Sequence, residues 1–255
     1  MGDGQRDSGP PPLDVQAPDG PAALDGALDK APSPDLVPPT KDLGTCPAVC
    51  TNGCAGGICK LDCSNGCTCP PGLKCEVVCA QGSCTGDVNC GQALGCDIDC
   101  ADKTGGNACT GVITCGSGPC TVRCGPDSCK GDINCGAASA CDIACADSAC
   151  AKAITCGPGS CKVACDSYAC TGDVNCSQST SCSVSCSPVG TGACGGDITC
   201  GPGDCKVVCG HKSCGDVNCS ASCGCSVECG PAACGVVSCP AKCSGACDPG
   251  DGCTC

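Results

Sequence analysis

Aromatic residues are almost absent from this chain of 255 residues, which has no Phe, no Trp and one Tyr, Tyr168. Large aromatic side chains normally supply much of the apolar area that a globular core buries. The apolar residues that remain, mainly Val, Ile, Ala and Cys, can fill only a thin interior. We therefore expect no conventional globular core, and cross-links must supply part of the stability.

Basic residues and long apolar runs are also scarce. Lys and Arg number 13 against 26 Asp and Glu, so the net charge is -13 and the pI is near 4.2. Nucleic acids and anionic membrane surfaces need a basic face, so neither is an expected partner. No apolar run reaches the roughly 18 residues of a transmembrane segment. The start MGDGQRDSG lacks the layout of a signal peptide, so we expect any signal to precede the numbered chain.

Groups that could support catalysis are few. The single histidine, His211 in Gly-His-Lys, stands between two repeats and is predicted to be an exposed loop residue. Nucleophilic Ser or Cys chemistry needs a positioned base, and a cysteine in a disulfide is not a nucleophile. We therefore expect no enzymatic activity, no catalytic residue and no cofactor.

Cysteine is what the chain has in excess: 44 residues, an even number. Such a content is typical of a disulfide scaffold. So many thiols would not stay paired in a reducing cytosol, so the sequence predicts an extracellular, outer-surface or periplasmic location. The alternative is a reduced protein that binds metal through thiolates.

The first 45 residues differ from the rest of the chain. Residues 1–45 contain no cysteine and are rich in Pro and Asp, including Pro10-Pro11-Pro12 and Pro38-Pro39. This composition cannot bury enough surface to fold. We interpret this segment as a disordered linker that holds the remainder away from a surface.

The remainder is repetitive. Eight units follow one another at a spacing of roughly 20–25 residues, which falls in the solenoid range. The first unit, CTGDVNCGQALGCDIDC, begins at Cys84, and the others begin at Cys109, Cys129, Cys150, Cys170, Cys194, Cys214 and Cys234. We divide this part into an N-terminal cap with two weak coils (46–83), regular repeats (84–246) and a C-terminal cap (247–255).

Residue parity within a unit predicts strands. In the first unit Cys84, Gly86, Val88 and Cys90 lie two apart, as do Cys96, Ile98 and Cys100, so Cys and Val or Ile share one face. Turn-forming runs separate the two segments. A unit is too short to bury its own face. The sequence therefore predicts an all-β, disulfide-laced solenoid of about ten two-strand coils.

The turn between the two strands brings two cysteines together within disulfide reach. We expect one such bridge in every unit: Cys90–Cys96, Cys115–Cys120, Cys135–Cys141, Cys156–Cys161, Cys176–Cys182 and Cys200–Cys205. At the other edge Cys100 can meet Cys84 or Cys109. Bridges between coils are the rival arrangement, and the sequence does not choose.

Outward residues of stacked coils should form rows spaced by about 4.8 Å. One row is predicted to contain Asn89, Thr114, Asn134, Thr155, Asn175, Thr199, Asn218 and Ser238. Their amide and hydroxyl groups can bond to one another, which favours a stabilising role. Asn175-Cys-Ser and Asn218-Cys-Ser match the N-glycosylation pattern, but we interpret both asparagines as members of the row.

Three groups of residues are candidates for ligand binding. Asp173, Asp197 and Asp216 occupy equivalent places in consecutive coils and could hold Ca²⁺, against the simpler interpretation of solvated surface carboxylates. The pairs Cys67-Thr-Cys69, Cys223-Gly-Cys225 and Cys253-Thr-Cys255 could chelate a soft metal if reduced. The threonines of the row invite comparison with disulfide-rich antifreeze solenoids, but the alternating Asn and the flanking Asp make ice binding a lesser alternative.

The tail (Gly2 to Pro39) and the repeated GDVNC…CxVxC pattern together resemble uncharacterised Cys-rich-repeat lipoproteins on the surface of Gram-negative bacteria. This resemblance implies a lipid-anchored surface protein, although the lipid-bearing cysteine is not in the chain. Our leading hypothesis is a non-enzymatic structural or adhesive solenoid that presents a rigid acidic face to a protein or polysaccharide. The alternatives are metallothionein-like metal binding and self-association into fibres through the solenoid ends.

Overall fold

The computed structural model describes residues 46–101, 106–188, 192–240 and 253–254. The chain separates into two units, Met1–Asp42 and Leu43–Cys255, and the described residues all belong to the second unit. The linker expected over residues 1–45 and most of the cap expected over 247–255 therefore lie outside the described residues. In the described residues all regular structure is β-strand, as the sequence predicted.

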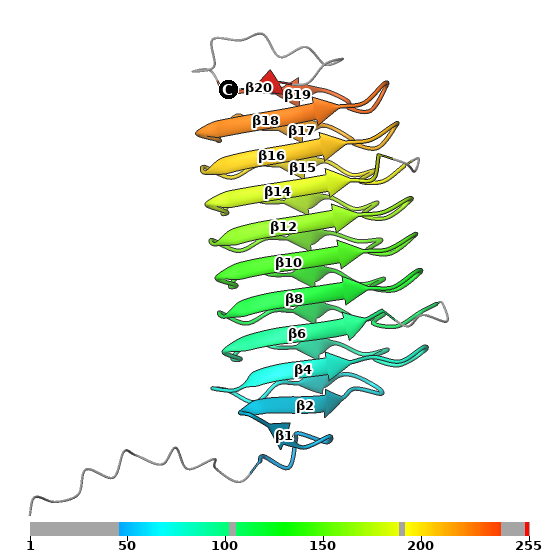
Figure 1. Cartoon of the computed structure of the whole chain (residues 1–255), viewed down its shortest axis with the longest axis vertical. Coiled ribbons are helices and arrows are strands. Elements are labelled where there is room, and N and C mark those ends of the chain that lie inside the picture. The colour runs from blue at the N-terminus through cyan, green and yellow to red at the C-terminus, as the bar shows by residue number, and fades with distance from the viewer. Residues whose placement is uncertain (1–45, 102–105, 189–191, 241–252, 255) are drawn as a thin grey trace, which may run out of the picture. The chain divides into compact units, whose positions relative to one another are not determined.

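Two stacks of parallel strands form the solenoid (Figure 1). One stack consists of long strands of five or six residues: β2 (Ile58–Asp62), β4 (Lys74–Val78), β6 (Gly95–Cys100), β8 (Pro119–Cys124), β10 (Ala140–Cys145), β12 (Ser160–Cys165), β14 (Ser181–Cys186), β16 (Asp204–Cys209) and β18 (Gly224–Cys229). The other consists of two-residue strands: β3 (Cys67–Thr68), β5 (Val88–Asn89), β7 (Ile113–Thr114), β9 (Ile133–Asn134), β11 (Ile154–Thr155), β13 (Val174–Asn175), β15 (Ile198–Thr199), β17 (Val217–Asn218) and β19 (Val237–Ser238). Each coil contributes one strand to each stack.

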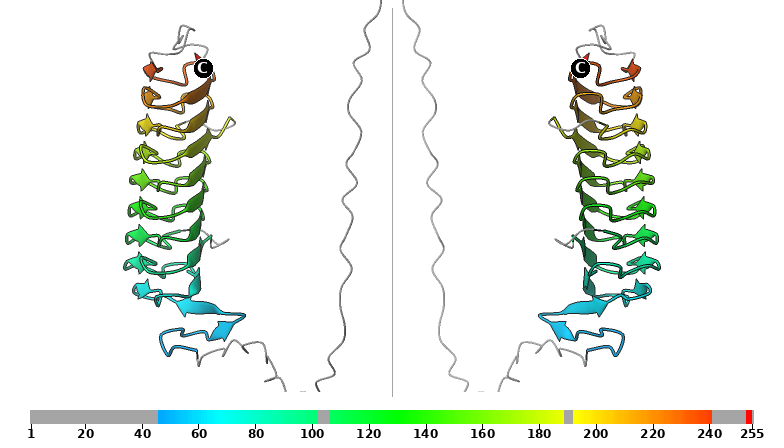
Figure 2. Two further views of the ribbon diagram at one scale, coloured as in Figure 1. Left: turned by 90° about the vertical axis from the view of Figure 1, so that its left-hand side faces the viewer. Right: turned by 90° about the vertical axis from the view of Figure 1, so that its right-hand side faces the viewer.

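The two stacks lie opposite each other (Figure 2) and enclose a narrow core. Along β10 the side chains alternate, with Cys141, Ile143 and Cys145 buried and Asp142 and Ala144 exposed. The facing short strand β9 contributes Ile133, which is 1% exposed. Each fully buried Val or Ile contributes about 1.5–3 kcal/mol relative to an exposed one. The core is therefore one aliphatic side chain deep on each side, flanked by sulfur.

Short antiparallel strands cover both ends of the long-strand sheet. β1 (Cys54–Ala55) pairs with β2 at one end, and β20 (Cys253–Thr254) pairs with β18 at the other. An uncovered edge strand offers free backbone groups to other chains, so these strands act as caps. The described part of the short-strand sheet ends at β3 and β19.

The first strand of each unit is shorter than the parity pattern predicted. The expected strand from Cys84 to Cys90 reduces to β5 because Cys84 has a left-handed backbone, with φ of 53°. The same conformation recurs at the equivalent cysteines Cys109, Cys129, Cys150, Cys170 and Cys194. These cysteines form a corner between coils, so the strand can begin only after them.

Each complete coil carries two disulfides, one at each of its edges. The turn between the two strands is closed by pairs such as Cys135–Cys141, and the corner between coils is closed by pairs such as Cys145–Cys150. Sulfur atoms of successive coils also touch: Cys135 Sγ lies 3.4 Å from Cys115 Sγ. The disulfides therefore form part of the packed interior.

Two kinds of coil alternate along the stack. The sequence separation of the turn disulfides is 6, 5, 6, 5, 6, 5 and 6 from Cys90–Cys96 to Cys219–Cys225. Each longer turn contains a small buried side chain, such as Ala138 or Ser179. The shorter turn of the next coil has a glycine, such as Gly157 or Gly201, that packs against it. At Gly157 a Cβ atom would overlap the carbonyl oxygen of Ala138. The structural repeat is thus a pair of coils.

Candidate functional site

The short-strand face carries the row predicted from the sequence. The strand register places Asn89, Thr114, Asn134, Thr155, Asn175, Thr199, Asn218 and Ser238 at equivalent positions of successive coils. The Val or Ile beside each of them points into the core, so one polar residue per short strand faces outward. The fold therefore produces a regular row of amide and hydroxyl groups, spaced by about 4.8 Å.

The asparagines of this row bond locally, which differs from the expected bonding along the row. Asn89 Oδ1 accepts a hydrogen bond from the backbone N–H of Gly91 at 2.8 Å, and Asn134 and Asn175 accept from the residue two positions later in the same way. Asn218 Oδ1 accepts both the N–H and the hydroxyl of Ser220. Such Asx turns fix the side chain against its own turn. The Nδ2 donor is then the group that each exposed asparagine can offer to a partner.

A second row, two residues before the first, contains the carboxylates. Asp173 Oδ1 accepts a hydrogen bond from the backbone N–H of Asp197 at 3.0 Å, and Asp197 Oδ1 accepts from Asp216 at 3.0 Å. Asp216 Oδ1 in turn accepts from the N–H of Val236. In the same way, Asp87 Oδ1 accepts from the N–H of Val112 and Asp132 Oδ1 accepts from the N–H of Ala153, each in the next coil. Each carboxylate therefore links two coils through one of its oxygens.

This arrangement bears on the calcium hypothesis. Asp173, Asp197 and Asp216 do occupy one row in consecutive coils, and all three are exposed. One oxygen of each is used by a backbone N–H, which leaves the other oxygen for solvent or a ligand. The bonds give these residues a structural role that the sequence did not reveal. Calcium binding at this row stays a prediction.

The long-strand face is mixed in charge. Ion pairs link neighbouring coils on it: Lys60 with Glu76 at 3.2 Å, Arg123 with Asp97 at 2.6 Å and Lys206 with Glu228 at 3.8 Å. All are solvent-exposed, so each contributes little stability. A shallow groove of about 560 Å³ follows the edge of this face across five coils, with Arg123, Ala144, Ala164 and Ser185 among its lining residues.

The structure places the expected disulfide partners together. It joins Cys90 to Cys96, Cys115 to Cys120, Cys135 to Cys141, Cys156 to Cys161, Cys176 to Cys182 and Cys200 to Cys205. At the other edge, which the sequence left open, Cys100 pairs with Cys109 and Cys84 with Cys79. Each coil is thus tied both to itself and to the next.

The Cys-x-Cys pairs do not act as chelating pairs in this structure. Cys67 is bonded to Cys63 and Cys69 to Cys75, so the two members belong to different disulfides. Cys225 is bonded to Cys219, whereas Cys223 is an exposed free thiol. Cys253 lies in β20, and Cys255 lies outside the described residues.

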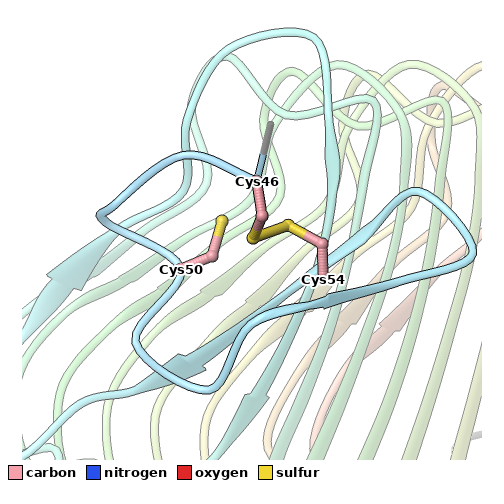
Figure 3. A group of neighbouring side chains, drawn as sticks. All are labelled: Cys46, Cys50 and Cys54. Atoms are coloured by element: carbon pink, nitrogen blue, oxygen red, sulfur yellow. A yellow bond between two sulfur atoms is a disulfide. The ribbon is translucent and has the colours of Figure 1, made fainter. Parts of the chain in front are cut away.

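Sulfur atoms gather in groups of three at several points of the solenoid. One group lies in the N-terminal cap, where the sulfur atoms of Cys46, Cys50 and Cys54 are within 4.8 Å of one another (Figure 3). Others lie within the coils, such as Cys115, Cys135 and Cys141. Because the groups within the coils depend on which coils stack, spacing alone did not reveal them. His211 is exposed in the turn after β16, where the sequence predicted a loop.

Comparisons with known proteins found no matching family model, no matching curated protein and no matching solved structure. No helix among the described residues is long and apolar enough to span a membrane. The residues themselves therefore have to carry the functional argument.

Proposed function

We propose that this chain is a non-enzymatic, secreted or cell-surface structural and adhesive protein, whose short-strand face binds a polysaccharide. The observation that carries the proposal is the pair of parallel rows on that face. One row offers the amides and hydroxyls of Asn and Thr in successive coils. The other offers carboxylates in three consecutive coils, at Asp173, Asp197 and Asp216, and at Asp87 and Asp132 in earlier coils, where Val112 and Ala153 interrupt the row.

A periodic surface suits a periodic partner. The coil spacing of about 4.8 Å is close to the length of one sugar unit in an extended polysaccharide. Hydroxyl groups of such a polymer can donate to the free carboxylate oxygens and accept from the asparagine Nδ2 groups. Because the side chains are already fixed by backbone hydrogen bonds, little side-chain entropy is lost on binding.

The compartment follows from the sulfur chemistry. Disulfides in every coil indicate an oxidising environment such as the cell exterior. They also hold the two rows in register without a thick core. A secreted or surface-anchored location would bring the rows into contact with extracellular polymers.

The experiment compares two triple variants in a pull-down of the full chain with a panel of insoluble polysaccharides. Asp173→Asn, Asp197→Asn and Asp216→Asn remove three charges but keep the Oδ1 acceptors. Asp99→Asn, Asp142→Asn and Asp204→Asn change the net charge equally on the long-strand face and serve as the control. We expect the first variant to lose at least tenfold in affinity and the control to bind as the unaltered chain does. Equal binding by both variants, or no polysaccharide bound by the unaltered chain, would contradict the proposal.

Self-association is a second candidate function. Within the described residues β1 and β20 cover the ends of the long-strand sheet, whereas the short-strand sheet ends at β3 and β19. Strand edges of this kind can pair with a second copy. Light scattering and electron microscopy of the purified chain should show end-to-end fibres, and a monomer at all concentrations would exclude this candidate.

A further inference from the structure

Residues 46–59, called the cap from here on, hold four cysteines within one short loop and hairpin. Cys46 is bonded to Cys54, and Cys50 is bonded to Cys59. The backbone around them is a pair of tight turns, in which the N–H of Cys50 donates to Pro47 and the N–H of Gly53 donates to Cys50. Three of the cysteines lie outside the stacked coils, because β1 has two residues and pairs only with β2. Cys59 lies in β2 and is held by the pairing of that strand with β4. The sulfur atoms of Cys46, Cys50 and Cys54 can therefore move towards Cys59 without displacing a coil.

Three of the four sulfur atoms form one group: those of Cys46, Cys50 and Cys54 lie within 4.8 Å of one another (Figure 3). Cys59 is bonded to Cys50 and lies opposite Cys54 in the pairing of β1 with β2. A tetrahedral Zn²⁺ site with Zn–S bonds of about 2.3 Å separates its sulfur atoms by about 3.8 Å. Opening the two disulfides would let the sulfur atoms of Cys46, Cys50 and Cys54 move by about 1–2 Å to that spacing, and would free Cys59 as the fourth ligand.

Accessibility distinguishes this cluster from the sulfur groups in the coils. Cys54 is exposed and Cys46 reaches the surface, whereas Cys50 and Cys59 are 5% and 0% exposed. The groups around Cys100, Cys115, Cys124 and Cys156 are buried throughout. A reductant and a metal ion can therefore reach the cap from solvent, while the disulfides of the central coils, from Cys90–Cys96 to Cys200–Cys205, are buried between their neighbours.

We propose that the cap is a redox-dependent zinc site with Cys46, Cys50, Cys54 and Cys59 as its four ligands. Two molecules of a dithiol reductant supply four electrons and four protons, break the two S–S bonds and leave as cyclic disulfides. Zn²⁺ then displaces the four thiol protons and forms four Zn–S bonds. After zinc is removed, two molecules of an oxidised dithiol accept four electrons and four protons, and the two disulfides form again. The proposal does not depend on polysaccharide binding.

The test uses the full chain with Cys223→Ser, so that its exposed free thiol cannot bind metal. The chain is titrated with a dithiol under nitrogen in the presence of Zn²⁺, freed of unbound metal and analysed for zinc by mass spectrometry. Alkylation after removal of the metal, followed by peptide mapping, shows which disulfides have opened. We expect one zinc per chain at a reductant concentration that opens the cap bonds and leaves the coil bonds closed. Co²⁺ in place of Zn²⁺ should show the absorption of a tetrahedral thiolate site.

Two variants locate the zinc. Cys46→Ser with Cys54→Ser removes two ligands and should lower the zinc affinity at least a hundredfold. Cys229→Ser with Cys234→Ser removes a half-buried pair from the far end of the solenoid and should leave one zinc bound. Zinc retained by the cap variant would overturn the proposal. So would an absence of zinc once both cap bonds are open, or coil bonds that open as readily as those of the cap.

Discussion

Disulfides hold together both the central coils and the N-terminal cap, but these disulfides are buried to different extents in the two regions. In both, disulfides close loops of fewer than ten residues. In the central coils, from Cys84 to Cys209, every cysteine is buried between neighbouring coils, whereas Cys54 of the cap is exposed. The difference shows that stacking, and not the disulfides alone, shields the interior. A change at the centre should therefore cost more than the same change in the cap.

Removing a disulfide should show the largest contrast. Cys135→Ala with Cys141→Ala should lower the free energy of unfolding by about 4 kcal/mol, because both loop closure and buried sulfur packing are lost. Cys46→Ala with Cys54→Ala should cost about 2 kcal/mol, since mainly the loop-closure contribution is lost. Urea unfolding without reductant measures both losses of stability. Equal losses would show that burial between coils adds nothing to the contribution of a disulfide.

Truncating a core side chain should give a smaller contrast. Ile143→Ala in β10 should cost about 3 kcal/mol, because coils on both sides prevent the cavity from collapsing. Leu61→Ala in β2 removes a similar volume next to the cap and should cost about 2 kcal/mol, since the end of the stack can relax. Both side chains are buried, at 0% and 3% exposure. A greater loss from Leu61→Ala in thermal unfolding would contradict the expected order.

Neighbouring glycines test how closely the coils approach each other. At Gly196 a Cβ atom would overlap the backbone of Gly172 in the preceding coil, whereas at Gly195 it would make an ordinary contact at 3.8 Å. Gly196→Ala should therefore cost about 2 kcal/mol through overpacking, and Gly195→Ala should change stability by less than about 0.5 kcal/mol. If both substitutions have the same effect on the urea midpoint, the coils are not in the described contact.

The smallest expected effect is a gain. Ala232 has a left-handed backbone, with φ of 53°, at the corner after β18. A residue with a Cβ atom is strained there, so Ala232→Gly should raise the free energy of unfolding by up to about 1 kcal/mol. Ala221, whose φ is not left-handed, is the control, and its replacement by Gly should be neutral or destabilising. A loss of stability with Ala232→Gly would show that the corner is not strained.

Much of the fold could be predicted from the sequence because its signals are local. Parity places Ile98 and Cys96 on one face, and a turn of fixed length brings Cys90 to Cys96. The row of Asn89 and its equivalents follows from stacking alone. Parity overestimates the length of the first strand, but Lys152, which stands at the position of Gly86 in another unit, indicates from the sequence that the first cysteine of a unit lies near a corner. The partner choice of Cys100 depended on that corner.

The candidate sites were less predictable, because they depend on contacts between coils. The bond from the N–H of Asp197 to Asp173 spans 24 residues, and no motif marks it. The alternation of two kinds of coil had a signal, namely turn disulfides with separations of 6 and 5 residues in turn. The only sequence signal for the cap cluster of Cys46, Cys50 and Cys54 is the close spacing of these cysteines, and similar spacings occur throughout the chain.

The state of the cysteines tests the central claim most directly. The structure pairs 38 cysteines in the disulfides of the described residues, and Cys239 is also bonded. The native protein is denatured without reductant, alkylated and weighed intact, and then reduced and alkylated again. We predict that at most four cysteines, Cys223 among them, react in the first step, because the 38 paired cysteines, Cys239 and the partner of Cys239 account for 40 of the 44. Alkylation of most of the 44 cysteines in the first step would contradict the account.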